Sequence, residues 1–273
     1  FKWIQTVDPL EIIAHRILWS IPFLAGFLLL RDRGEFFAKM RLPLKTIGIL
    51  FVSGALVVTN WFIFVWAVVD GQVLATSLGY FIGPLVNFLL GFLFLKERLT
   101  RVQTIGVLLA ACGTLSLGWF LGTPPWIALS LAFSFGLYGL VRKMLGVGPM
   151  VGLLWETLLL ALPAAVYMAW VIKQGNHGFG AGEPHIDVLL ILAGLVTVLP
   201  LIWFNVAARN LKLSTVGFFQ YIAPSMTFLL SVFLYDEPFT QGHSVAFTCI
   251  WFALAIVSFE TIMRSRRIPV NKQ

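Results

Sequence analysis

The chain has 273 residues, of which 59% are hydrophobic and 11% are charged. Apolar stretches follow one another from end to end, each about 20 residues long, which is the length that a helix needs to cross roughly 30 Å of hydrocarbon. The net charge of +7 comes from basic residues scattered over short loops, so we predict no nucleic-acid partner. The composition predicts an all-α, polytopic membrane protein embedded in a lipid bilayer.

Hydropathy predicts nine full membrane spans, and the connections between them are too short to hold a soluble domain. The spans are expected near residues 10–30, 46–69, 73–95, 102–121, 124–141, 150–172, 186–208, 213–235 and 242–262. The chain starts with Phe1, and the turn-like sequence VDP follows soon after. We therefore interpret residues 1–4 as the tail of a tenth helix whose beginning is absent.

Loop charge predicts the orientation. Of the 19 basic residues, 16 lie in alternate connections and in the C-terminal tail, two (Lys2 and Lys173) lie in the intervening connections, and Arg16 lies inside a span. Arg142 and Lys143 are counted among the loop residues. The positive-inside rule then predicts that both termini are cytoplasmic.

Two distant phrases of the chain are related. FLLGFLFLKERLT begins at Phe88 and FLLSVFLYDEPFT begins at Phe228, and an ungapped shift of 140 residues gives nine identities over residues 61–100. A repeat of five helices must leave its second copy inverted in the membrane. We predict a first repeat at residues 1–121, truncated at its N-terminus, and a second repeat with a cytoplasmic tail at residues 122–273, with Glu97 inside and Glu237 outside.

Polar residues follow the same repeat. Two trios are related by the 140-residue shift: Tyr80, Pro84 and Asn87 in one span, and Gln220, Pro224 and Thr227 in the other. Each trio falls on one helical face, and each proline frees the carbonyl four residues before it. Two interpretations remain open: a face that contacts substrate, or helix kinks that neighbouring side chains satisfy.

The span that begins near residue 10 contains His15 and Arg16. An arginine deep in hydrocarbon costs about 2.5–3.5 kcal/mol, so its side chain is expected to face protein, a cavity or the interface. The shift of 140 pairs Arg16 with Glu156. We hypothesise that Arg16 attracts an anionic group of the substrate or pairs with an acid during one half of the transport cycle, and that Glu156 carries a coupling proton at the opposite gate. The alternatives are snorkelling of Arg16 to the headgroups and packing roles for both residues. We count His15, Arg16, Glu156 and Tyr221 among the predicted substrate-binding residues.

Four phrases of the chain resemble those of RarD-type permeases, which are members of the EamA branch of the drug/metabolite transporter superfamily. They are PLEIIAHRILWSIP, ATSLGYFIGPLVNFLLGFLFLKERL, SFGLYGLVRK and STVGFFQYIAPSMTFLLSVFLYDEPF. The resemblance implies ten helices in two inverted five-helix halves, a bacterial inner-membrane location and a central cavity. The residues that it places in helices of the cavity wall are Asn60, Tyr80, Pro84, Asn87, Tyr138, Asn205, Gln220 and Pro224.

We predict a secondary transporter that exports small metabolites or drugs by alternating access. The substrate is expected to be an amino acid, another metabolite or a chloramphenicol-like drug. A channel or a non-transporting regulatory membrane protein is the alternative. No GxSxG or HExxH motif occurs, so no enzymatic activity and no cofactor are predicted.

Two further groups of residues have simple interpretations. The glycine-rich stretch QGNHGFGAGEPHID, from Gln174 to Asp187, is predicted to be a solvated flexible loop rather than a metal site. Aromatic residues near the polar trios either fill the bundle, which we favour, or stack on a planar substrate. They are Tyr80, Phe81, Phe218, Phe219 and Tyr221.

Overall fold

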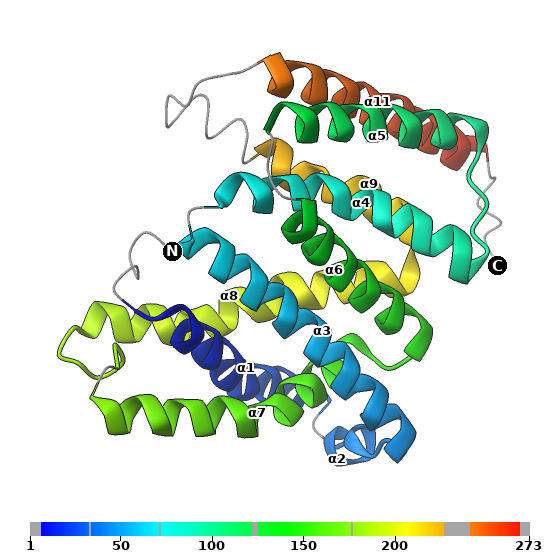
Figure 1. The fold of residues 1–273 in the computed structure, drawn as a ribbon. Coiled ribbons are helices and arrows are strands. Elements are labelled where there is room, and N and C mark those ends of the chain that lie inside the picture. Colours follow the sequence, from blue (N-terminus) through cyan, green and yellow to red (C-terminus); the bar gives the residue numbers. More distant parts are fainter. Residues whose placement is uncertain are drawn as a thin grey trace. The chain divides into compact units, whose positions relative to one another are not determined.

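The computed structural model describes residues 7–32, 34–70, 72–121, 125–175, 177–226 and 241–267. Within these ranges the ordered elements are helices, with no strand among them (Figure 1). The labelled helices are α1 (Pro9–Arg31), α2 (Phe36–Met40), α3 (Leu44–Val69), α4 (Val73–Leu95), α5 (Arg101–Leu121), α6 (Pro125–Leu145), α7 (Pro149–Gln174), α8 (Pro184–Asn210), α9 (Leu213–Gln220) and α11 (Gln241–Arg267). In the described part of the chain, seven of them (α1 and α3 to α8) are long and apolar enough to cross a membrane, which confirms a polytopic helical membrane protein.

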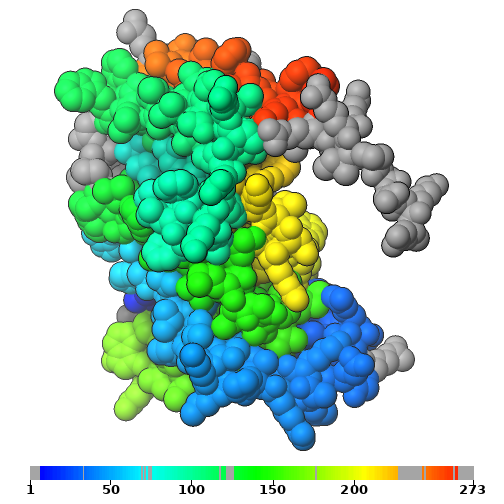
Figure 2. Space-filling model, turned by 90° about the vertical axis from the view of Figure 1, so that its right-hand side faces the viewer, coloured from blue at the N-terminus to red at the C-terminus, as the bar shows by residue number. Residues whose placement is uncertain are grey.

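The helices carry large apolar side chains on their surfaces. Leu115, Leu162 and Val196 are among the exposed residues that a water-soluble protein would bury. Extended exposed apolar surface is typical of protein that faces lipid. Figure 2 shows the chain in space-filling form, coloured along the sequence. The prediction of a surrounding bilayer thus agrees with where these side chains lie.

The predicted span 213–235 is described only as far as residue 226, and within that part it is interrupted. α9 ends at Gln220, the backbone N–H of Tyr221 donates to the carbonyls of Phe218 and Phe219, and residues 222–226 are again helical. The interruption lies just before Pro224, whose ring crowds the carbonyl of Gln220 and whose nitrogen cannot donate to it. α4 continues through Pro84 without such a break.

The helices repeat in the same register as the sequence. Each of three helices begins 140 residues before a counterpart: α1 at Pro9 and α7 at Pro149, α3 at Leu44 and α8 at Pro184, α4 at Val73 and α9 at Leu213. The repeat therefore extends from identities in the sequence to the starting points of helices. The division at residue 121 and the full set of ten helices stay predictions.

The chain forms two compact units, and each unit combines helices from both halves of the sequence. Unit 1 contains residues 1–69 and 137–210, and unit 2 contains residues 70–136 and 211–273. In unit 1, α1 packs against its counterpart α7 and also against α8; in unit 2, α4 packs against α9 and α5 packs against α11. The apolar core of unit 1 includes Leu24, Leu154 and Val198, whereas that of unit 2 includes Phe88 and Ile250.

Candidate functional site

Unit 1 contains a buried carboxylate with partners on two other helices. Glu156 lies in α7 and is 2% exposed. Its carboxylate accepts a hydrogen bond from the hydroxyl of Ser53 in α3 at 2.8 Å and one from the hydroxyl of Tyr138 in α6 at 3.5 Å. The Nε atom of Arg142, also in α6, lies 3.6 Å from the same carboxylate. A buried charge is tolerated only when it has such partners.

The prediction that Arg142 lies in a loop is wrong. α6 continues to Leu145, and Arg142 is 4% exposed. Its Nε donates to Oδ1 of Asn205 at 3.0 Å, and Nη2 donates to the backbone carbonyl of Pro149 at 3.1 Å. The guanidinium is drawn inward because Glu156 and these two oxygens supply the acceptors that it would otherwise find in water.

Asn205 completes the polar network. Its Nδ2 donates to the hydroxyl of Tyr138 at 2.7 Å and to the carbonyl of Leu201 at 2.9 Å. Three residues of the predicted set, Tyr138, Glu156 and Asn205, are therefore brought together. Arg142 and Ser53 are missing from that set, although Arg142 lies four residues after Tyr138 and so shares its helical face.

A small cavity adjoins this network within unit 1. Its walls are mostly apolar side chains of α1, α3, α7 and α8, and its polar lining residues are Ser20, Glu156, Thr157 and Thr197. About 20 Å³ of the cavity is open to the centre of a water molecule. A cavity of this size has room for no more than a water molecule or two, so a metabolite would need a more open arrangement of the four helices.

Arg16 contacts two residues that line the same cavity. Its Nε donates to Oγ1 of Thr197 at 2.8 Å, and its guanidinium carbon lies 4.0 Å from the centre of the Trp61 ring. Thr197 and Trp61 both line the cavity. Arg16 thus has protein partners on α8 and α3, as expected of a cation that is kept away from lipid.

The two charged residues have related surroundings. Arg16 and Glu156 each stand eighth in their helices, α1 and α7. Arg16 bonds a hydroxyl of α8, and Glu156 bonds a hydroxyl of α3; α3 and α8 are themselves counterparts in the repeat. The same type of contact is therefore made twice, once with a cation and once with an anion.

His15 belongs to a different cluster from its neighbour Arg16. It is nearly buried, and its Nδ1 accepts a hydrogen bond from the indole of Trp19 at 3.1 Å. Its Nε2 lies 3.8 Å from a carboxylate oxygen of Glu11. Asn60, another residue of the predicted set, is partly buried in α3.

Unit 2 contains the predicted trios as far as they are described. Nδ2 of Asn87 donates to Oε1 of Gln220, which joins α4 to α9. Pro84 is buried, and its backbone carbonyl lies close to Gly217. Tyr80 is 53% exposed, and Thr227 lies outside the described residues.

The aromatic residues near these trios differ in their environments. Phe81, Phe218 and Tyr221 belong to the apolar core of unit 2, as the filling interpretation expects. Phe219, like Tyr80, is largely exposed. Packing in the core therefore explains Phe81, Phe218 and Tyr221, but not the two exposed residues.

Glu97 has a structural role that the sequence did not reveal. Its carboxylate accepts hydrogen bonds from the backbone N–H of Leu213 at 2.7 Å and of Ser214 at 3.1 Å, and from the Ser214 hydroxyl at 2.8 Å. These amides belong to the first turn of α9, where the helix has no internal acceptors for them. Glu97 therefore caps α9 from the end of α4 and is buried.

Comparisons with known proteins agree with this architecture. Residues 2–119 match the EamA-like transporter family. A solved crystal structure is similar with a TM-score of 0.70 at 16% sequence identity, covering 93% of this chain and 88% of the other. At that identity the likeness concerns the fold alone.

Sequence relatives extend the match to nearly the whole chain. Protein RarD of Salmonella typhi is 43% identical over 267 residues, which is 98% of this chain and 91% of the relative. The chloramphenicol-sensitive protein RarD of Pseudomonas aeruginosa is 28% identical over 270 residues, or 97% and 89% of the two chains. The chain therefore belongs to the EamA-like transporter family and, within it, to the RarD-type proteins.

Proposed function

We propose that the protein is a secondary transporter that exports small metabolites or drugs across the bacterial inner membrane by alternating access. One observation carries this proposal: Glu156 lines a cavity inside otherwise apolar helices, and Arg16 bonds two other lining residues. Ionisable groups at such positions are costly and are commonly functional. In transporters built from inverted repeats, the substrate site typically lies where the repeats meet.

The two charged residues have separate proposed roles. Arg16 attracts an anionic group of the substrate, since its guanidinium is held beside the cavity by Thr197 and Trp61. Glu156 carries a coupling proton, since its carboxylate lines the cavity, and the buried cation Arg142 stabilises the carboxylate once the proton has left. The substrate class is an amino acid, another metabolite or a drug similar to the chloramphenicol in the name of one relative.

Counterflow in proteoliposomes tests transport. Purified protein is reconstituted with unlabelled compound inside, and entry of labelled chloramphenicol is followed, together with any metabolite that raises the melting temperature in a thermal-shift screen. A carrier gives saturable uptake with a transient overshoot. A linear, non-saturating flux would favour the channel alternative, and no specific flux for any binding compound would favour a regulatory protein.

Two substitutions test the proposed roles. Arg16→Gln and Glu156→Gln each remove a charge while keeping a similar volume, and each is expected to lower counterflow at least tenfold in protein that still inserts. Glu183→Gln is the matched control, because Glu183 is exposed and its ion-pair partner is His185. If both test variants transport like the control, Arg16 and Glu156 have packing roles only.

A further inference from the structure

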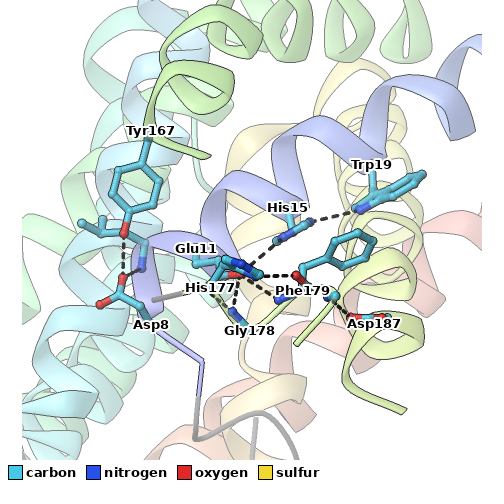
Figure 3. Close-up of polar contacts among 11 residues, drawn as sticks. Asp8, Glu11, His15, Trp19, Tyr167, His177, Gly178, Phe179 and Asp187 are labelled. Atoms are coloured by element: carbon cyan, nitrogen blue, oxygen red, sulfur yellow. Dashed lines mark hydrogen bonds and ion pairs between the residues drawn. The ribbon is translucent and has the colours of Figure 1, made fainter. Parts of the chain in front are cut away.

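The loop between α7 and α8 folds back onto the beginning of α1 (Figure 3). Glu11 of α1 is 0% exposed, and its carboxylate accepts hydrogen bonds from the backbone N–H of Gly178 at 3.0 and 3.1 Å and of Phe179 at 3.2 Å. The stretch predicted to be solvated and flexible is thus anchored at residues 178 and 179. The physical reason is that a buried carboxylate needs donors, and these two amides supply them.

Other contacts hold the same loop. The Phe179 ring lies 4.9 Å from the His15 ring, centre to centre, and Val7 packs against Gly178 so closely that a larger residue at 178 would overlap it. The backbone N–H of Gly180 donates to Asp187 at 2.7 Å. We refer to residues 177–180 as the strap.

His15 lies beside Glu11 but does not form a hydrogen bond with its carboxylate. The indole N–H of Trp19 can only donate, so Nδ1 of His15 is the acceptor and a neutral ring carries its proton on Nε2. That Nε2 faces Glu11 at 3.8 Å and has no hydrogen-bond partner among the described residues. Glu11 is therefore held chiefly by backbone amides of the strap.

The strap lies on the helices that form the cavity. It is part of the connection between α7 and α8, and α1 packs against both of these helices. Glu11 precedes by less than two turns Ile17 of the same helix, which lines the cavity together with Ser20. Gly194 of α8 approaches the backbone of Ser20 closely, so a displacement of α1 relative to α8 would change the cavity wall.

We propose that the strap is a gate for this cavity and that Glu11 is its latch. When the strap is bound, it ties α1 to the α7–α8 connection; when it is released, water replaces the amides around Glu11, so both states satisfy the carboxylate. Gly175, Gly180 and Gly182 have positive φ values, which glycine adopts without the penalty of a Cβ. This proposal rests on the proposed transport function. Loop charge predicts that the strap lies on the external side of the membrane.

A disulfide can lock the strap in place. A Cβ on Gly178 would lie 3.4 Å from the Cβ of Val7, close to the separation of about 3.5–4.5 Å found in disulfides. The test protein carries Val7→Cys and Gly178→Cys, with Thr157→Cys as a reporter in the cavity wall. Both native cysteines, Cys112 and Cys249, are replaced by serine.

Labelling of the reporter by an impermeant maleimide from outside is measured in intact cells, by peptide mass spectrometry. We expect labelling at position 157 to be at least tenfold slower in the oxidised protein than after reduction. A protein with the reporter alone, treated with the same oxidant, controls for direct oxidation. Equal rates in the locked and reduced proteins, or no labelling in either, would overturn the gate.

The latch is tested separately with Glu11→Gln and with Glu183→Gln as a matched control in the same loop. Glutamine loses the negative charge, and its amide nitrogen replaces the second oxygen that accepts from Gly178. The anchor is therefore weaker, and hydrogen exchange of residues 177–180 and labelling at position 157 should both become faster. The control should change neither rate. If Glu11→Gln behaves like the control, Glu11 is not the latch. Loss of counterflow in every protein, with the labelling difference intact, would reject the proposed function and leave the gate standing.

Discussion

The guanidinium of Arg142 occupies the space that a side chain at Gly152 would need. A Cβ built on Gly152 would overlap Nη1 of Arg142 and crowd the rest of the group. Glycine at this position of α7 therefore allows the arginine of α6 to lie flat against the helix. From there the guanidinium reaches Asn205 and the carbonyl of Pro149.

Gly152→Ala should consequently destabilise unit 1. Overpacking of a filled interior typically costs about 1–3 kcal/mol, and here it would also move a buried cation away from its acceptors. We expect a lower melting temperature in detergent. Gly26→Ala is the control, because Gly26 lies inside α1 and a Cβ there meets no atom within 4 Å; it should leave the melting temperature unchanged or raise it slightly.

The pair of Arg142 and Glu156 should show coupling in a double-mutant cycle. Arg142→Gln or Glu156→Gln alone leaves one buried charge without its partner, a loss that costs about 3–5 kcal/mol for well-formed buried pairs. Because the two groups are 3.6 Å apart, we expect a destabilisation at or below the lower end of this range. Thermal unfolding should show that the double variant is more stable than the sum of the single effects predicts, and strict additivity would mean that the two charges do not stabilise each other.

Helix positions could be predicted from the sequence because they depend on local composition. The span expected near residues 73–95 has the same bounds as α4, and the one near residues 46–69 corresponds to α3, which begins at Leu44. Such positions need no knowledge of which helices are neighbours. The interruption after Gln220 is different: Pro224 removes the amide that would bond the Gln220 carbonyl, yet Pro84 does the same in α4 without a break.

The polar contacts could not be predicted in the same way, because they depend on partners far away in the chain. Arg142 and Glu97 both lie near the ends of apolar spans, where the positive-inside rule and the repeat account for them as loop residues. Their actual partners, Asn205 and the first turn of α9, are more than 60 residues distant. Glu11 is the third case, since its donors are 167 and 168 residues away.

Asn87 and Gln220 allow a test of whether the polar face in unit 2 contacts substrate. Their side chains bond each other, so Asn87→Ala and Gln220→Ala each remove one partner of a hydrogen bond that joins α4 to α9. If the face contacts substrate, each variant should weaken the apparent affinity for a transported compound severalfold while the melting temperature falls by only a few degrees. Thr104→Ala is the control, because the exposed Thr104 hydroxyl bonds the carbonyl of Thr100, four residues before it. Unchanged affinity in both test variants would assign the pair a purely structural role.

The predicted sides of two connections can be tested with single cysteines. Glu97 is unsuitable, since a cysteine there would remove the cap of α9, and Glu237 lies outside the described residues. Arg98 and Glu183 are exposed alternatives on connections that loop charge places on opposite sides of the membrane. With Cys112 and Cys249 replaced by serine, an impermeant maleimide should label Glu183→Cys and not Arg98→Cys in intact cells, and the reverse in inverted vesicles.

Removing Arg98 leaves 15 of the 16 basic residues of the predicted cytoplasmic side, so the orientation itself should not change. Labelling of both positions from the same side would contradict the predicted topology and, with it, the external placement of the strap.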